Sequence, residues 1–164
     1  MKIYCLQFDI AWENKAANFA RVETLLAQSQ PEPGSLILLP EMFATGFSMN
    51  VAAIQEIPGG ETERFLCATA RKFQAFLLAG IVTQDPEGRA RNQSLVIDPE
   101  GRELARYSKI QSFTPGGEAG HYVAGVAPLI FHWQGWAVSP FICYDLRFPE
   151  HFRAATRLGA QLIT

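Results

Sequence analysis

The chain has 164 residues, of which 48% are hydrophobic and 18% are charged, and its formal net charge is −2. This composition predicts one globular domain over residues 1–164 and excludes a disordered chain. Lys and Arg residues are scattered along the sequence, so the chain offers no basic surface for nucleic acid or for an anionic membrane. No apolar run approaches the length of a membrane span.

Three cysteines, Cys5, Cys67 and Cys143, are spread over the chain. A sparse, odd-numbered set is not a disulfide framework and suits a reducing compartment. The histidines are isolated from one another, so the sequence predicts no zinc site. Asp9 interrupts the N-terminal apolar run too early for a signal peptide. We therefore expect a cytoplasmic protein.

Strands and helices alternate in the first half of the chain. Residues 3–10 form an apolar run that predicts a strand, and residues 14–30 carry an apolar stripe at helical spacing. Residues 35–39 are apolar almost throughout, as expected of a buried strand. A second helix is predicted over 63–73 and a further strand over 75–83. This alternation indicates an α/β domain.

Two hairpins and a helix are predicted in the second half. The predicted strands are 92–97 with 102–107, and 129–133 with 136–142, and the predicted helix is 148–158. The turn Asp98-Pro99-Glu100-Gly101 is a strong hairpin signal, so the sheet should contain antiparallel as well as parallel pairs. Residues 108–125 form a long polar loop, and such loops are often functional.

Three reactive or ionisable residues each follow a predicted strand: Glu41, Lys109 and Cys143. Ligands of open α/β sheets bind at the carboxyl ends of strands, so parallel, adjacent strands would bring these side chains together. Cys143 also precedes a predicted helix, whose N-terminus would lower the pKa of its thiol. The alternative is a cysteine that packs in the core, beside a Glu and a Lys that face water.

The sequence resembles the carbon–nitrogen hydrolases of the nitrilase superfamily over its whole length. Residues 38–43 (Leu-Leu-Pro-Glu-Met-Phe) are similar to the segment that holds the catalytic Glu of that family. Residues 107–109 (Tyr-Ser-Lys) resemble the segment of its catalytic Lys, and residues 143–150 (Cys-Tyr-Asp-Leu-Arg-Phe-Pro-Glu) resemble that of its nucleophile. Each segment alone is moderately specific, whereas the three in this order and at this spacing are strongly specific.

The resemblance implies hydrolysis of a non-peptide C–N bond through a cysteine thioester, without metal or organic cofactor. It assigns Cys143 as the nucleophile, Glu41 as the general base and Lys109 as the cation that stabilises the oxyanion. The backbone N–H of Tyr144 would be a second oxyanion donor. Glu118 matches a second acidic residue of the family and would orient Lys109 or the substrate amide. The alternative for Glu118 is a solvated loop acid.

Other residues are candidates for supporting or binding roles. Asp145 and Arg147 match residues that brace the turn through ion pairs in the family, and the alternative for Arg147 is to bind a substrate carboxylate. Four aromatic residues either line the pocket or pack in the core: Phe43, Phe47, Phe113 and Tyr122. Many relatives have His-Leu-Phe where this chain has residues 111–113 (Gln-Ser-Phe), which we interpret as a difference in the pocket wall.

The resemblance also implies a fold and an assembly. The fold is α/β, the four-layer α-β-β-α sandwich of the nitrilase type with mixed sheets, and the family forms homodimers. Because the sequence stops at residues 159–164, where a strand begins, we expect it to be the N-terminal part of a domain truncated at its C-terminus. One alternative function is therefore that of a non-catalytic fragment.

The substrate expected from the resemblance is a small amide. Residues 40–49 and 143–149 are most similar to the omega-amidase group, which deamidates amides of 2-oxo acids such as 2-oxoglutaramate. The alternatives within the superfamily are another amidase, a carbamoylase or a nitrilase.

Overall fold

A computed structural model describes residues 1–164, which form two β-sheets and the helices that cover them. The first sheet contains β1 (Ile3–Cys5), β2 (Leu36–Leu38), β3 (Phe76–Gln84), β4 (Ala90–Ile97) and β5 (Glu103–Ser108) in this order. The second sheet contains β6 (Phe131–Trp133), β7 (Trp136–Ser139) and β8 (Leu162–Ile163). The helices are α1 (Lys15–Ser29), α2 (Val51–Ile54), α3 (Glu61–Phe73) and α4 (Pro149–Arg157). Short 3₁₀ turns occupy Thr114–Gly116, Glu118–Gly120 and Cys143–Arg147.

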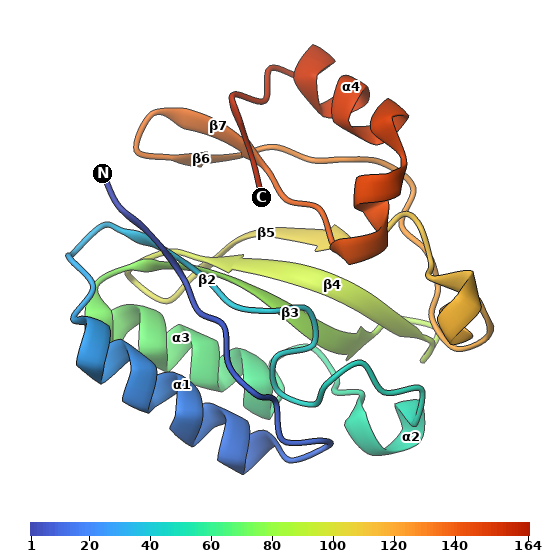
Figure 1. Ribbon diagram of the computed structural model, residues 1–164, viewed down its shortest axis with the longest axis horizontal. Helices are drawn as coiled ribbons and strands as arrows, with labels where there is room; N and C mark the ends of the chain where they lie inside the picture. The colour runs from blue at the N-terminus through green and yellow to red at the C-terminus, as the bar shows by residue number, and fades with distance from the viewer.

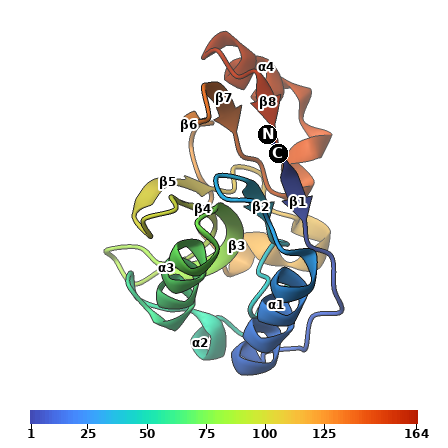
Figure 2. The same ribbon diagram turned by 90° about the vertical axis from the view of Figure 1, so that its left-hand side faces the viewer.

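The elements are stacked in four layers. Helices α1 and α3 cover one face of the first sheet, and the second sheet lies over its other face with α4 outside it (Figure 1). The view turned by 90° shows the same order, with α4 and β7 at the end of the molecule away from α1 and α3 (Figure 2). The α-β-β-α order predicted from the resemblance is confirmed.

The first sheet is mixed, and its topology decides which strand ends meet. Strands β1, β2 and β3 are parallel, β4 is antiparallel to β3, and β5 is antiparallel to β4. Strands β2 and β5 therefore run in the same direction, and β4 begins at the end of the sheet where β2 and β5 finish. Both predicted hairpins are confirmed, as β4–β5 and β6–β7.

Alternating side chains on the first sheet serve two cores. On one face, Ile37, Leu77 and Leu95 pack with residues of α1 and α3 such as Val22 and Leu66. On the other face, side chains of β2, β3 and β4 meet those of β6 and β7: Leu36, Leu78, Val96, Phe131, Trp133 and Val138. A sheet that is buried on both faces needs apolar side chains on both sides of each strand. Residues 35–39 therefore do not alternate between apolar and polar residues.

Some boundaries differ from those predicted. The strand predicted over 3–10 ends at Cys5, because Asn18 of α1 binds the backbone N–H and C=O of Ala11 and draws the chain away from the sheet. The strand predicted over 136–142 ends at Ser139. The short helix α2 forms in a segment for which the sequence predicted no helix or strand. None of the helices combines the length and the apolar character that crossing a membrane would require.

Candidate active site

Cys143 opens the 3₁₀ turn Cys143–Arg147, here called the Cys143 turn, which follows β7 and the extended residues after it. Its backbone has a φ of +44°, in the left-handed region that non-glycine residues rarely occupy. Such a conformation is unfavourable by about 1–3 kcal/mol and persists only where the surroundings hold it. The residue is exposed, so the strained turn presents its thiol at the surface of the protein.

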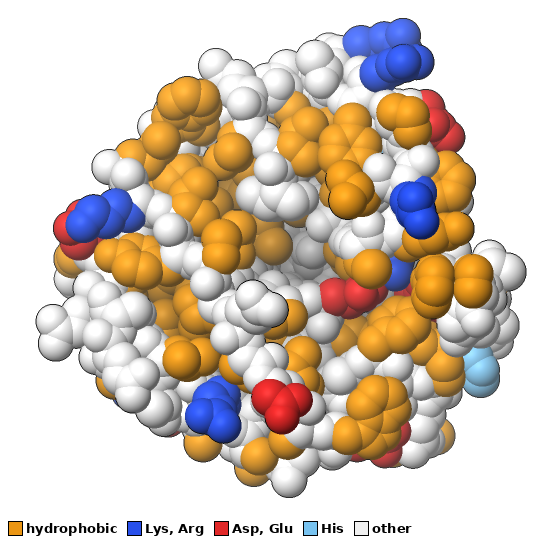
Figure 3. All heavy atoms as spheres, in the orientation of Figure 1, with side chains coloured by type: hydrophobic (Ala, Val, Ile, Leu, Met, Phe, Trp, Pro, Cys, Tyr) orange, Lys and Arg blue, Asp and Glu red, His pale blue; other side chains and the backbone are white.

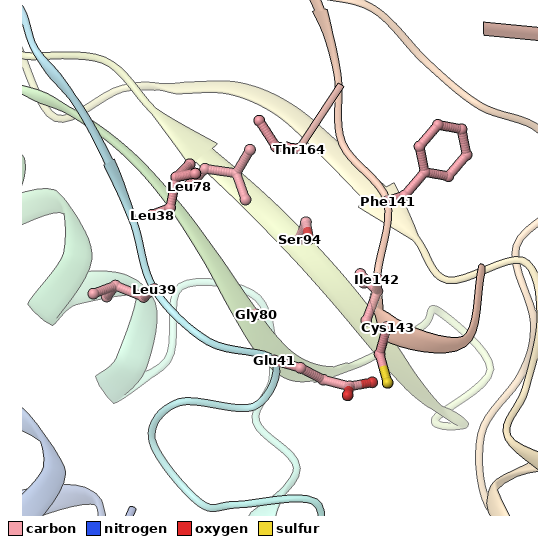
Figure 4. Close-up of a pocket in the computed structure, with 10 residues that line it drawn as sticks. All are labelled: Leu38, Leu39, Glu41, Leu78, Gly80, Ser94, Phe141, Ile142, Cys143 and Thr164. Carbon is pink, nitrogen blue, oxygen red and sulfur yellow. The ribbon is translucent and has the colours of Figure 1, made fainter. Parts of the chain in front are cut away.

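Lys109 lies between two carboxylates. Its Nζ is 2.7 Å from Oε1 of Glu41 and 2.9 Å from Oε2 of Glu118. The Lys109 and Glu118 side chains are almost fully buried, whereas that of Glu41 keeps 19% of its surface exposed. Glu41 faces Cys143, as Figure 4 shows. The structure thus brings Glu41, Lys109, Glu118 and Cys143 together.

The sequence suggested that adjacent parallel strands would bring Glu41, Lys109 and Cys143 together. The structure brings them together from strands that are not adjacent. Strands β3 and β4 separate β2, which precedes Glu41, from β5, which precedes Lys109. Cys143 comes from the other sheet. The site therefore lies at the C-terminal ends of β2 and β5 in the first sheet. The segment that follows β7 of the second sheet adds Cys143.

Asn92 is a member of this cluster that the sequence analysis missed. Its Nδ2 donates hydrogen bonds to Oε1 of Glu41 at 2.7 Å and to Oε1 of Glu118 at 2.8 Å. The residue lies near the start of β4, at the edge where β2 and β5 end. Asn92 carries no charge and belongs to a predicted strand, so nothing in the sequence was a reason to select it. Its place in the site follows only from the antiparallel direction of β4.

Asp145 connects the Cys143 turn to the segment around Lys109. Its fully buried carboxylate accepts hydrogen bonds from the hydroxyl of Tyr107 at 2.6 Å and from the backbone N–H of Gln111 at 2.8 Å. It also accepts one from the backbone N–H of Ile142 at 3.0 Å. One carboxylate thus binds residues on both sides of Lys109 and the residue before Cys143.

The pKa of the Cys143 thiol is raised, which contradicts the expectation that a helix end lowers it. Partial burial of the thiol raises this pKa most, the charge of Glu41 raises it further, and Lys109 opposes them. The helix α4 begins only at Pro149, so its N-terminus does not lie at the thiol. For Lys109, burial lowers the pKa, but the two carboxylates outweigh it and the pKa is raised. Both the Cys143 thiol and the Lys109 ammonium therefore hold their protons more tightly than usual.

Aromatic side chains surround the cluster. The Phe113 ring lies 5.1 Å from that of Tyr144 and 6.3 Å from that of Phe47, between ring centroids. Nζ of Lys109 lies 5.2 Å from the centroid of the Phe47 ring. The backbone N–H of Phe113 donates to Glu118, a contact within the loop 108–125 that holds Phe113 beside the cluster.

Two aromatic candidates take other places. Phe43 is fully buried in the core between the first sheet and its helices, with its ring near that of Phe19. Tyr122 is buried, and its hydroxyl donates to the backbone carbonyl of Ser48. Both side chains pack in the interior, which favours core packing over pocket lining, the two roles that the sequence left open for them.

The ion pairs expected to brace the Cys143 turn are also not formed. Arg147 is exposed and makes no ion pair, and Asp145 acts through hydrogen bonds alone. Gln111, where many relatives have His, contacts His151 of α4 through its side-chain nitrogen at 3.0 Å. That position therefore joins the loop 108–125 to α4.

A cavity of about 180 Å³ extends from Glu41 and Cys143 into the space between the two sheets. Leu38, Leu78 and Phe141 line its apolar part (Figure 4). On the face shown in Figure 3, hydrophobic side chains surround a hollow that has acidic atoms at its right-hand side. No group of three His, Cys, Asp or Glu side chains is placed to hold a metal ion.

Two amidases are similar to this chain in sequence. The chain is 37% identical over 149 residues to the omega-amidase YafV of Yersinia enterocolitica, covering 91% of this chain and 56% of that protein. It is 30% identical over 162 residues to the 2-oxoglutaramate amidase of Bacillus subtilis, covering 98% of this chain and 62% of that protein. The chain thus spans little more than half the length of these relatives.

Solved structures share the fold. XC1258 of Xanthomonas campestris, a CN-hydrolase superfamily protein with an arsenic adduct in its active site, superposes with a TM-score of 0.82 at 30% identity. The match covers 90% of this chain and 55% of that one. An amidase from Nesterenkonia sp. AN1, with acrylamide added to its active-site cysteine, gives a TM-score of 0.81 at 25% identity, covering 98% and 64%. The family model described as carbon-nitrogen hydrolase matches residues 2–164. The chain therefore belongs to the carbon–nitrogen hydrolase family.

Proposed function

We propose that this chain carries the reacting groups of an amidase that works through a cysteine thioester. The observation that supports this most is the position of Lys109 between Glu41 and Glu118, next to a thiol on a strained turn. Nucleophile, base and oxyanion donor are the three roles that acyl transfer requires. The cluster offers one group for each.

In the first half of the reaction, Sγ of Cys143 attacks the amide carbon while Glu41 takes the thiol proton. The raised pKa of the thiol makes its ionisation before attack less favourable, so we propose that the proton leaves during attack. Nζ of Lys109 and the backbone N–H of Tyr144 stabilise the oxyanion, and removal of one such donor typically costs a factor of about 10²–10³ in rate. Glu41 then gives its proton to the departing nitrogen, and the C–N bond breaks to release ammonia.

In the second half, Glu41 takes a proton from water, which attacks the thioester carbon. The C–S bond breaks, the carboxylic acid product leaves, and the Cys143 sulfur takes the proton that Glu41 received from water. Glu118 shares no bond with the reacting atoms in this scheme. Its contact with Nζ holds Lys109 in place, and its burial keeps this contact free of competing water.

The substrate class that we propose is the amide of a small 2-oxo acid, such as 2-oxoglutaramate, whose products are the dicarboxylate and ammonia. The names of the Yersinia and Bacillus relatives support it, at 37% and 30% identity. Another amidase, carbamoylase or nitrilase activity is the alternative within the family. We also propose that the protein acts as a homodimer, which sedimentation of the purified protein would test.

The test is ammonia release by full-length protein from 2-oxoglutaramate and from a panel of other amides, ureas and nitriles. We expect release from the 2-oxo acid amide, a thioester adduct on Cys143 by mass spectrometry, and loss of both in Cys143→Ala. Turnover of another amide alone would refute the substrate class but not the mechanism. Activity retained in Cys143→Ala would refute the mechanism.

A further inference from the structure

We propose that Asn92 is a positioning residue that holds Glu41 by Oε1 and thereby reserves Oε2 for proton exchange with Cys143. The inference rests on the proposed role of Glu41 as the base. Asn92 Nδ2 and Lys109 Nζ both donate to Oε1 of Glu41, each at 2.7 Å, and neither donates to Oε2. A carboxylate oxygen that accepts two hydrogen bonds is a weaker base than one that accepts none, so the free oxygen is the one suited to take the proton.

The orientation of the Asn92 amide follows from its partners. Ionised carboxylates can only accept hydrogen bonds, so the NH₂ group must face Glu41 and Glu118. This leaves Oδ1 of Asn92 buried without a partner. An unpaired buried acceptor destabilises the fold, and native proteins rarely tolerate one without a function. Both N–H groups of the amide donate to the two carboxylates. Packing alone would not require this pair of hydrogen bonds.

The absence of charge on Asn92 matters as much as its two hydrogens. Lys109 supplies one positive charge between two carboxylates, and the raised pKa of Cys143 reflects burial first and then the charge of Glu41. A second cation at position 92 would weaken Glu41 as a base, and a third acid would repel it. An amide fixes both carboxylates and leaves the net charge of the cluster unchanged.

The backbone of Asn92 also holds the segment of Lys109. Its carbonyl accepts a hydrogen bond from the backbone N–H of Lys109 at 2.9 Å. The residue is itself held in β4 opposite Val82 of β3. Asn92 thus fixes the base through its side chain and the segment of the oxyanion donor through its main chain, from a rigid strand rather than from a loop.

The first test is the pH dependence of Cys143 alkylation by iodoacetamide in full-length protein, which needs no substrate. Glu41→Gln removes a negative charge beside the thiol, so the alkylation profile should move to lower pH by about one unit. Asn92→Ala removes a donor that offsets this charge, so its profile should move to higher pH by a smaller amount. In the Glu41→Gln background, the shift caused by Asn92→Ala should be smaller, because only the hydrogen bond of Asn92 to Glu118 then remains to be lost.

Gln93→Ala is the matched control. Gln93 is a buried amide next to Asn92 in β4, but it bonds to Thr83, Ser108 and Arg106 instead of to the cluster. We expect it to lower the melting temperature and leave the alkylation profile in place. An Asn92→Ala profile that matches the wild type, or that shifts equally with and without Glu41, would overturn the proposal.

Amide turnover gives the second test. We expect Asn92→Ala to lower kcat by about 10²-fold, as misplaced catalytic groups do, with KM nearly unchanged. Equal losses of kcat in Asn92→Ala and Gln93→Ala at equal melting temperatures would contradict the inference. If the wild-type protein hydrolyses no amide at all, the proposed function fails, while the alkylation series still decides the role of Asn92.

Discussion

Tyr107 donates its hydroxyl hydrogen to the carboxylate of Asp145 at 2.6 Å, in a fully buried contact between β5 and the Cys143 turn. Burial raises the pKa of the Tyr107 phenol most, followed by the hydrogen bond to Asp145 and then by the charge of Asp145. The phenol therefore keeps its proton at neutral pH and can donate this hydrogen bond. It joins the strand that ends before Lys109 to the turn that carries the thiol.

The first prediction is that Tyr107→Phe loosens this connection. Hydrogen bonds to charged groups contribute about 1.5–3 kcal/mol, so we expect a loss of that order in the free energy of unfolding. We also expect a lower kcat with little change in KM, because Lys109 and Cys143 lose a shared anchor. Urea denaturation and steady-state kinetics on full-length protein measure the two effects.

Tyr122→Phe is the comparison for this prediction. Its hydroxyl is also buried, but it donates to a backbone carbonyl away from the Cys143 turn. We expect it to cost about 0.5–1.5 kcal/mol of stability and to leave kcat unchanged. If both Tyr variants lost the same fraction of kcat, Asp145 would have no special part in positioning the site.

The second prediction concerns the buried cation. Lys109→Met leaves Glu118 buried and Glu41 partly buried without their common partner. Removal of one member of a buried ion pair typically costs about 3–5 kcal/mol, and we expect a loss of this size together with loss of activity.

The double variant separates charge from packing. In Lys109→Met with Glu118→Gln, the buried charge on residue 118 is gone, so much of the lost stability should return while activity does not. Thermal unfolding of the two variants measures the difference. A double variant as unstable as Lys109→Met alone would show that the carboxylate of Glu118 is not what the cation stabilises.

The third prediction is a pH dependence. Because the pKa of the Cys143 thiol is raised, its thiolate forms at higher pH than that of an ordinary cysteine. In a Cys5→Ser, Cys67→Ser background, we expect the rate of iodoacetamide alkylation to rise at a higher pH than that of a small thiol such as glutathione. Rapid alkylation below neutral pH would instead indicate a thiolate that is already formed, and would overturn the raised pKa of the Cys143 thiol.

The sequence predicted the elements well where the signal is local. Asp98-Pro99-Glu100-Gly101 forms the turn of the β4–β5 hairpin, and the apolar stripe of 14–30 becomes α1, Lys15–Ser29. The strand over 3–10 was predicted too long because the apolar pattern does not show that the Asn18 side chain binds the backbone of Ala11.

The site was predicted in part for a similar reason. Glu41, Lys109 and Cys143 stand out because their side chains are reactive and follow strands, and the structure brings them together. Asn92 stands out only once the direction of β4 is known, and strand direction is set by long-range pairing. The pKa of Cys143 likewise depends on Glu41, which lies far from it in sequence.

The fourth prediction concerns Gly80 in β3, where the segment of Glu41 crosses closest to the sheet. A Cβ at this position would lie 2.5 Å from Cα of Glu41, 2.6 Å from N of Met42 and 2.7 Å from O of Pro40. These are backbone atoms, which cannot rotate away as a flexible side chain can. Gly80→Ala should therefore displace the main chain that carries Glu41, and a shift of about 1 Å at a catalytic group can cost about 10²-fold in rate.

Gly120→Ala is the control for Gly80→Ala. A Cβ at Gly120 meets no atom within 4 Å, and the residue does not have a positive φ. It should therefore keep the wild-type kcat, and the melting temperature should change little. For Gly80→Ala we expect a fall in kcat and in melting temperature, measured on full-length protein with the substrate found in the amide panel. A Gly80→Ala variant with the activity of Gly120→Ala would show that the Glu41 segment can shift without consequence, and that the close contact with β3 does not set the position of the base.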